Sequence, residues 1–315
     1  MFSSMDYVYE VYKERSFSKA AANLYISQPS LSANISRTER KVGYPLFDRS
    51  TKPLGLTECG RRYIECAEKI RAIEDEFRTY VNDLGGLRTG KLVFGGSSFF
   101  SSFVLPPLIA EFSDQYPELD IQLVEAKSME LVKQMMDSKV DFILDNKDLD
   151  LKYFDRHQVG TEQLLLVVPR DFVTEPELEN QRIPYAAIED GSFRSDNWPT
   201  VDLSNFEGRP FIFLHPYNDT GKRAYQICAE QDFKPEIALE LDQQMTAYNV
   251  ACSGIGITFS GEVLLQRATP SPNVVYYKLK SKKNVRSLYF YWKRGRYISQ
   301  AMQAFLDSVV YQTRL

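Results

Sequence analysis

The sequence predicts an α/β protein that begins with a winged helix-turn-helix followed by one long helix. Three observations support this prediction. Residues 16–47 read as two short helices separated by a tight break, residues 57–84 keep one amphipathic pattern, and strand and helix patterns alternate from residue 90 onward. The chain has 315 residues, more than one core of ordinary size needs, so we expect more than one domain.

The N-terminal helix pair is expected over residues 18–24 and from Ser27 to about Val42, where Ser27 caps the second helix and Gly43 ends it. Small polar residues and arginines on its outer face would suit the major groove of DNA, because short side chains allow close approach and Arg and Asn match base edges. That face comprises Pro29, Ala33, Ser36, Arg37 and Arg40, flanked by Ser30 and Asn34, and the buried stripe comprises Leu31, Ile35, Thr38 and Val42. A solvated helical hairpin is the alternative.

A short β wing is expected over residues 45–56, with a basic tip at Arg49, Thr51 and Lys52 that could grip phosphate or the minor groove. Charge separates this end from the rest of the chain. Residues 15–62 hold nine Lys or Arg against three Asp or Glu, a net charge of +6, so a total of −4 leaves −10 for the remainder. The basic end is therefore the candidate for a polyanionic partner.

One long helix is expected from Thr57 to Leu84, with Gly85–Gly86 ending it. Its apolar positions alternate steps of four and three, which is the heptad spacing of a helix that pairs with a second copy. These positions are Cys59, Tyr63, Cys66, Ile70, Ile73, Phe77, Tyr80 and Leu84. Packing of the same stripe on its own body remains the alternative.

The larger region alternates strands and helices, which favours parallel sheets covered by helices. Strands are expected at 91–96, 120–125, 141–145, 163–168, 210–214, 236–241, 254–259, 274–279 and 287–293. Helices are expected around 101–115, 128–138, 221–231, 243–253 and 298–312.

The segments "SFSKAAANLYISQPSLSANISRTERKVGYPLFDR" and "LTECG" resemble the LysR-type transcriptional regulators, and so do "LPPLIAEFSDQYPELDIQLVE" and "VACSGIGITFS" further along. Thr38 departs from the family, which usually has Leu there, and a hydroxyl in the packed stripe should loosen the core slightly. The resemblance implies that the second helix and the wing face DNA. The candidate DNA contacts are Ser18, Gln28, Pro29, Ser30, Ser32, Asn34, Arg37, Arg49 and Lys52.

The resemblance also implies a domain plan: a winged helix-turn-helix over 1–62, a linker and dimerisation helix over 57–86, and an effector-binding region of two lobes like those of periplasmic binding proteins. Lobe I would comprise 89–162 and 268–315, lobe II would comprise 163–267, and two crossover strands would join them. The resemblance is weakest at 179–200, which reads as an insertion or long loop. The implied dimer contacts are Tyr63, Cys66, Ile70, Ile73, Phe77, Tyr80 and Leu84.

A small polar effector is expected where strands end and helices begin, because helix N-termini offer unpaired N–H groups there. The candidates are Ser97, Ser98, Ser128, Asn218 and Thr220, and the family's effector pocket falls on the first two of these junctions. Hydroxyls and amides at these places would suit a carboxylate or a similar anion. Simple helix capping by the same residues is the alternative.

No catalytic or metal-binding pattern is found. His157 and His215 are isolated, and the four cysteines form no CxxC pair, which fits reduced thiols in a cytoplasmic protein. No apolar run approaches the roughly 20 residues that span a bilayer. The prediction is therefore a regulator without cofactor or metal that binds an inverted-repeat operator as a dimer or tetramer, with RNA polymerase as a further partner. A solute-binding protein or an enzyme using the interlobe cleft are the rival predictions.

Overall fold

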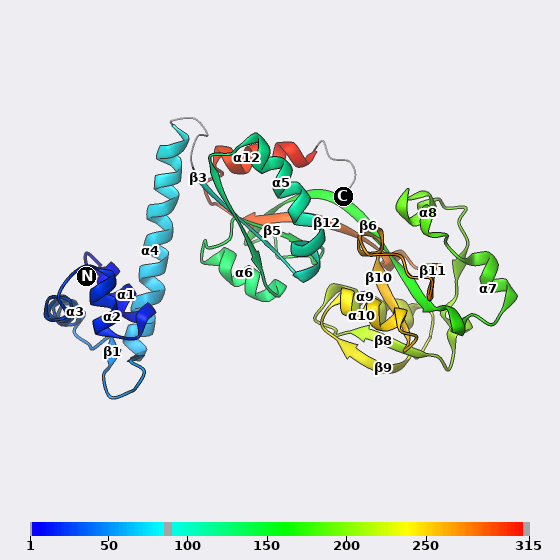
Figure 1. Ribbon diagram of the computed structural model, residues 1–315, viewed down its shortest axis with the longest axis horizontal. Coiled ribbons are helices and arrows are strands. Elements are labelled where there is room, and N and C mark those ends of the chain that lie inside the picture. The colour runs from blue at the N-terminus through cyan, green and yellow to red at the C-terminus, as the bar shows by residue number, and fades with distance from the viewer. Residues whose placement is uncertain (1, 85–89, 311–315) are drawn as a thin grey trace. The chain divides into compact units, whose positions relative to one another are not determined.

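The computed structural model describes residues 2–84 and 90–310. Contacts within the chain divide it into two compact units, Met1–Leu84 and Gly85–Leu315, and each is described by itself. Figure 1 shows the smaller unit, called the head here, as a cluster of helices with a long helix rising from it. In the part of the chain that is described, no helix is both long and apolar enough to cross a membrane.

The head confirms the predicted helix pair and the wing. Ser27 caps α3 by accepting a hydrogen bond from the Ser30 N–H at 3.3 Å, and Gly43 ends the helix with a φ of 87°. The elements are α1 (Met5–Glu14), α2 (Phe17–Asn23), α3 (Gln28–Val42), β1 (Phe47–Asp48), β2 (Gly55–Leu56) and α4 (Glu58–Asp83). Helix α1 was not predicted, although Met5, Val8 and Val11 recur every third residue and are buried.

Thr38 lies in the core of the head without an unmet hydrogen bond. Its side chain is 3% exposed, and its hydroxyl donates to the Asn34 carbonyl at 3.1 Å. Backbone bonding of this kind satisfies a buried hydroxyl within its own helix. The loosening expected from the replacement of Leu is therefore limited to lost apolar contact.

Helix α4 is capped by Thr57, as predicted, and the expected stop at Gly85–Gly86 lies outside the described residues. The first part of its apolar stripe packs on its own head: Tyr63 is 4% exposed and stacks on Phe2, and Ile70 packs against the same core. For Tyr63 the dimer prediction is therefore wrong, because its ring has no surface left for a partner. The stripe becomes exposed only further along the helix.

The first sheet of the larger unit has the order β4-β3-β5-β12-β6, with β3 parallel to β4 and β5 and with β12 antiparallel to β5 and β6. Its strands are β3 (Gly90–Gly96), β4 (Leu119–Glu125), β5 (Phe142–Asp145), β6 (Phe154–Pro169) and β12 (Val285–Lys293). A π-helical turn (Phe100–Val104) and the helices α5 (Leu105–Gln115), α6 (Ser128–Met136) and α12 (Gln300–Val310) belong to this lobe.

The second sheet has the order β9-β8-β10-β6-β11-β7 and begins where β6 leaves the first sheet. Its other strands are β7 (Thr200–Val201), β8 (Pro210–Leu214), β9 (Glu236–Leu241), β10 (Ile257–Gly261) and β11 (Val274–Leu279). Its helices are α7 (Pro176–Gln181), α8 (Tyr185–Glu189), α9 (Asp219–Glu230), α10 (Gln244–Cys252) and α11 (Glu262–Arg267). Single 3-10 turns lie at Arg170–Phe172, Ser192–Arg194, Leu203–Phe206 and Lys282–Asn284.

Strands β6 and β12 run side by side from one lobe to the other (Figure 1). The return to lobe I differs from the expected position at residue 268, because β11 pairs with β6 in the second sheet and returns only beyond Leu279. The cause is packing: Val275, Tyr277 and Leu279 are buried in the core of lobe II.

Residues 179–200 form a cover of short helices rather than a long loop. Ile183 bridges to Tyr276, and Ile188 and Phe193 are fully buried in the core. Helices α7 and α8 lie at the outer edge of lobe II (Figure 1).

Candidate DNA-binding head and effector site

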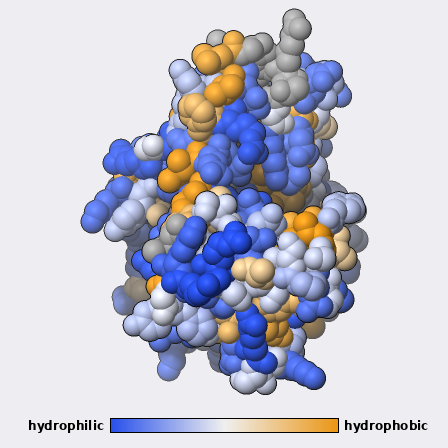
Figure 2. Space-filling view, turned by 90° about the vertical axis from the view of Figure 1, so that its left-hand side faces the viewer, coloured by the Kyte–Doolittle hydropathy of each residue, from blue (hydrophilic) through white to orange (hydrophobic). Residues whose placement is uncertain are grey.

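The outward face of α3 presents the predicted polar set. Gln28, Pro29, Ser30 and Arg37 are exposed, and Ser32 and Asn34 are half-exposed. Figure 2, which looks onto the side of the head where α3 lies, shows hydrophilic residues predominating there. No acidic group of the described chain lies within 4 Å of the Arg37 guanidinium, which leaves its donors available for a base or a phosphate.

Two polar contacts hold the ends of this face. The Ser18 hydroxyl donates to Gln28 Oε1 at 3.4 Å and ties α2 to α3, while Asn34 Nδ2 donates to the Ser30 carbonyl at 3.1 Å. The Asn34 amide is thus used within its own helix in this structure. Its second N–H and its Oδ1 take no part in this hydrogen bond and are available to an adenine edge.

Glu39 joins α3 to the root of the wing. Its Oε1 accepts hydrogen bonds from the N–H groups of Leu46 at 2.8 Å and Phe47 at 3.4 Å, and its Oε2 lies 3.5 Å from Arg49. The Arg49 guanidinium also stacks over the Phe17 ring at 5.3 Å. Arg49 therefore braces the wing, and only part of its charge faces outward.

The wing loop is held by side chains that bond its own backbone. Asp48 accepts hydrogen bonds from the Ser50 hydroxyl and N–H, which lower the pKa of Asp48, and Thr51 Oγ1 accepts from the Gly55 N–H at 3.0 Å. Lys52 is exposed between these anchors, and none of the described residues forms an ion pair with it. A fixed loop thus presents a free cation, as a phosphate contact requires.

The far half of α4 exposes a hydrophobic stripe. Ile73 is 67% exposed, Phe77 66%, Tyr80 44% and Leu84 72%, again at steps of four and three. Such large apolar groups in contiguous array on a helix mark a surface that another helix covers.

In lobe I, the predicted serines lie together at the ends of parallel strands. Gly96 pairs with Glu125 of β4 and Leu144 of β5, so Ser97 and Ser98 emerge beside both strands. The Ser98 hydroxyl donates to the Glu125 carboxylate. The Glu125 carboxylate therefore already accepts the hydrogen bond that Ser98 would offer to an anion.

Ser128 has the same chemistry. Its hydroxyl donates to Asp145, whose carboxyl is buried, and burial raises the pKa of Asp145 against the effect of that hydrogen bond. Because both serines serve carboxylates of the protein, an effector carboxylate placed between them would meet Glu125 and Asp145. The expectation of an anion at these serines is therefore not supported by the local charge.

Thr220 does not face a cleft. It is 1% exposed, and its hydroxyl accepts a hydrogen bond from Arg286 at 2.8 Å, so the prediction that it binds effector is wrong. Asn218, which is half-exposed, caps α9 by accepting the Thr220 N–H at 2.9 Å. Thr220 lies in the interior because the first turn of α9 turns inward toward the crossover strands.

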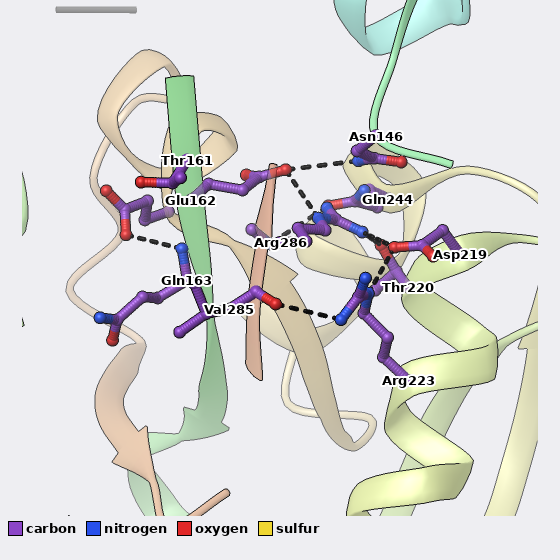
Figure 3. Close-up of polar contacts among 12 residues, drawn as sticks. Asn146, Thr161, Glu162, Gln163, Asp219, Thr220, Arg223, Gln244, Val285 and Arg286 are labelled. Atoms are coloured by element: carbon purple, nitrogen blue, oxygen red, sulfur yellow. Dashed lines mark hydrogen bonds and ion pairs between the residues drawn. The ribbon is translucent and has the colours of Figure 1, made fainter. Parts of the chain in front are cut away.

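A buried charge network surrounds Arg286 at the crossover (Figure 3). Arg286 and Glu162 are register partners on β12 and β6, and their side chains form an ion pair at 2.8 Å. Arg286 also lies 3.0 Å from Asp219, which pairs with Arg223 at 2.7 Å. Asn146 of lobe I donates to Glu162 at 3.3 Å, so the network reaches both lobes. Sequence reasoning missed it, because only strand pairing brings residues 162 and 286 together.

A hollow of about 270 Å³ lies between the lobes at the N-terminus of α9. It is lined by Lys147 and Asp148 of lobe I and by Asn218, Lys222 and neighbouring residues of lobe II. None of the described residues forms an ion pair with Lys147 or Lys222. Their free ammonium groups, together with the helix N-terminus, make this hollow attractive to an anion.

One direct ion pair joins the exposed surfaces of the two lobes, at a place called the mouth here. Lys127, after β4, lies 3.1 Å from Asp242, after β9, and Asp242 also accepts a hydrogen bond from the Tyr217 hydroxyl. These hydrogen bonds from Tyr217 and Lys127 lower the pKa of Asp242. The sequence placed residue 127 at one of the strand-to-helix junctions where a ligand was expected and did not indicate Asp242 as its partner.

Within the described ranges, no group of three or more His, Cys, Asp or Glu residues is arranged to hold a metal ion.

A helix-turn-helix head with a wing, followed by a two-lobed α/β unit with a polar hollow between the lobes, defines a DNA-binding regulator with a ligand-binding part. The family models agree: residues 2–61 match the bacterial regulatory helix-turn-helix protein of the lysR family, and residues 85–314 match the LysR substrate binding domain. The chain belongs to the LysR family and is a LysR-type transcriptional regulator.

Full-length relatives share this plan. The uncharacterized HTH-type transcriptional regulator YcgK of Bacillus subtilis is 30% identical over 303 residues, covering 96% of this chain and 92% of the relative. A probable RuBisCO transcriptional regulator of Gracilaria tenuistipitata is 24% identical over 306 residues, covering 95% and 92%.

Solved structures show the same fold. A full-length OxyR variant from Pseudomonas aeruginosa has a TM-score of 0.70 at 16% identity, covering 99% of this chain and 95% of that one. Full-length CbnR in complex with its target DNA has a TM-score of 0.65 at 16% identity and covers 100% of both chains.

Proposed function

We propose that the chain binds an inverted-repeat operator as a homodimer or homotetramer and that a small molecule between the lobes changes the arrangement of its DNA-binding heads. Arg37, which pairs with no acid of the described chain and lies on the exposed face of a capped recognition helix, is the observation that carries the DNA-binding part. The whole candidate set is Ser18, Gln28, Pro29, Ser30, Ser32, Asn34, Arg37, Arg49 and Lys52. CbnR, a structural neighbour, has been solved with its target DNA.

Arg37→Ala tests this contact. If Arg37 reads a base, operator affinity falls by about 1–3 kcal/mol and the salt dependence is kept; if it binds phosphate, the salt slope falls by about one charge. Arg267→Ala is the matched control, because Arg267 is an exposed arginine at the end of α11, in the effector-binding unit. Unchanged affinity and salt slope in fluorescence anisotropy would remove Arg37 from the interface.

Self-association is proposed through the exposed end of α4, with Ile73, Phe77, Tyr80 and Leu84 as its contacts. Cys66 and Ile70 lie between the buried and exposed parts of the stripe and would contribute only at its edge. A symmetric dimer matches an operator of two-fold symmetry, which is why two heads are needed for an inverted repeat.

For the effector, the anionic end is proposed at Lys147, Asn218 and Lys222 rather than at the serines. Ser97, Ser98 and Ser128 would then face the uncharged or donor-bearing part of the molecule, beside Glu125 and Asp145. A ligand can shift the heads only by binding one interlobe arrangement better than another. This assignment keeps the carboxylate that the sequence predicted and moves its site.

Lys222→Ala should weaken the effector response of an operator-driven reporter while leaving operator binding without effector intact. Lys234→Ala is the control, since Lys234 is an exposed lysine outside the hollow. An intact response in Lys222→Ala and in Lys147→Ala would exclude the hollow. Ser98→Ala reports separately on the serine junction.

The location of the protein, its lack of a cofactor and its contact with RNA polymerase are proposed from its role as a regulator of genes. The protein would work in the cytoplasm, where bacterial DNA lies, without cofactor or catalytic step, and would contact RNA polymerase when it activates. Turnover of a bound effector by the purified chain would argue for the rival enzyme function.

A further inference from the structure

A second hollow, of about 490 Å³, lies mainly on lobe II and reaches the crossover strands at Gln163 and Val285, and none of its lining residues lines the interlobe hollow. One wall comes from the end of the 179–200 cover, with Arg194, Asp196 and Thr200. The other comes from the end of β11, the turn after it and the first residue of β12, which are residues 278–282, 284 and 285, and Gln163 of β6 completes the lining. The segment 179–200, which the sequence predicted to be an insertion or long loop, thus builds one wall of the hollow.

The lining is strongly basic. Arg194, Lys278, Lys280 and Lys282 face it against one acid, Asp196. Arg194 is neutralised by the buried Glu262, to which its Nε donates at 2.8 Å. Three ammonium groups therefore remain against one carboxylate.

Lys278 is the most informative of them. It is 8% exposed, and its Nζ donates to the carbonyls of Ser195 at 2.8 Å and Arg194 at 3.4 Å. No carboxylate of the described chain lies within 4 Å of it. A buried cation held only by carbonyl groups leaves its charge uncompensated, and an anion in the hollow would compensate it.

Gln163 adds a second unsatisfied group. Its Oε1 is buried and has no hydrogen-bond partner among the described residues, although Gln163 lines the hollow. Buried side-chain oxygens are usually paired, so an unpaired one beside a hollow indicates a place for a donor from a ligand. The Gln163 N–H is bonded to Glu262, next to Glu162 of the crossover.

We propose that this hollow is a second small-molecule site, which binds a compact organic polyanion such as a polycarboxylate or a phosphorylated metabolite. The anion lies against Lys278, Lys280 and Lys282, and the Gln163 amide fixes its orientation. The hollow is lined by Gln163 of β6, the residue next to Glu162. An anion bound in it therefore acts on the crossover between the lobes. The site is separate from the proposed interlobe effector site.

Calorimetric titration of the full-length chain with citrate and with inorganic pyrophosphate, at matched ionic strength, tests the proposal and distinguishes the two anion chemistries. At least one anion is expected to bind, and the double variant Lys280→Ala, Lys282→Ala is expected to weaken it by about tenfold or more, or 1.4 kcal/mol. Both lysines are exposed, so folding is not at risk. Lys234→Ala is expected to bind like the natural chain, and so is Lys222→Ala, because Lys222 lines only the interlobe hollow.

Three results would overturn the proposal: neither anion binds the natural chain, the double variant binds as well as the natural chain, or Lys222→Ala alone abolishes binding. The last result would assign the anion to the interlobe site. The operator affinity of the double variant, measured in parallel, shows whether Lys280 and Lys282 contact DNA or a small molecule. If the double variant lost operator affinity and kept anion binding, the hollow would belong to a DNA-binding surface and the inference would be wrong.

Discussion

Arg286→Met is expected to destabilise the effector-binding unit strongly. The natural guanidinium is 1% exposed and serves two acids, Glu162 at 2.8 Å and Asp219 at 3.0 Å. Met has a similar shape and no charge, so the change removes the cation and leaves Glu162, which is 2% exposed, with the Asn146 amide at 3.3 Å as its remaining described hydrogen bond. Breaking one side of a buried ion pair typically costs about 3–5 kcal/mol.

The double variant Arg286→Met, Glu162→Met is expected to recover part of this loss. It removes the uncompensated charge, and buried pairs replaced by apolar side chains of similar volume are often neutral or better. Asp219 still loses one partner but keeps Arg223 at 2.7 Å. We therefore expect the double variant to be about 1.5–3 kcal/mol less stable than the natural chain, which is the worth of the one charge-assisted hydrogen bond that Asp219 loses.

Tryptophan emission during urea unfolding measures this difference cleanly. The chain has two tryptophans, Trp198 and Trp292, and both belong to the effector-binding unit, so the signal excludes the head. A loss below about 1 kcal/mol in Arg286→Met would refute the reasoning, because the network would then be hydrated rather than buried. A double variant as unstable as the single one would show that the network contributes through packing and not through charge.

Three further outcomes are expected. In Gly60→Ala the new Cβ would lie 1.9 Å from the Leu46 carbonyl oxygen, so α4 must move from the wing at a cost of about 1–3 kcal/mol in the thermal unfolding of the head, and an unchanged melting curve would contradict this. Phe77→Glu should shift the chain toward monomer in sedimentation, whereas Lys69→Glu on the same helix should not; equal effects would exclude the stripe as the interface. Burial raises the pKa of Asp145, so its ionisation opposes folding as pH rises from about 3.8 through the folded pKa. The stability of Asp145→Asn relative to the natural chain should therefore increase over that pH window. A decrease would show that ionised Asp145 stabilises the fold.

The sequence allowed the local structure to be predicted where signals lie close together in the chain. Ser27, Gly43 and Thr57 mark helix ends that the structure confirms, because caps act within one turn. The heptad stripe was harder, since the same spacing describes packing on the head and pairing with a copy. Only the structure divides it, with Tyr63 inside and Phe77 outside.

Long-range contacts were not predictable from a single chain. Arg286 and Glu162 are 124 residues apart, and neither belongs to a motif. Thr220 shows the opposite failure: its position at a helix N-terminus suggested a ligand, but the orientation of α9 turns it inward. Which face of a helix start meets solvent depends on packing of the whole lobe, and residue type alone does not encode it.

The two kinds of interlobe contact differ greatly in strength, and this difference suits a ligand-controlled switch. At the crossover, Arg286 joins buried groups whose disruption costs several kcal/mol, which keeps β6 and β12 together in every arrangement. At the mouth, the Lys127–Asp242 pair is exposed, with side chains 64% and 42% accessible, and such pairs are worth about 0–1 kcal/mol. A ligand of micromolar affinity provides about 8 kcal/mol, so even a small preference for one arrangement outweighs the mouth contact and leaves the crossover intact. Opening and closing should therefore take place about a fixed pair of strands, and Asp242→Asn should alter the effector concentration required while leaving the unfolding of the unit nearly unchanged.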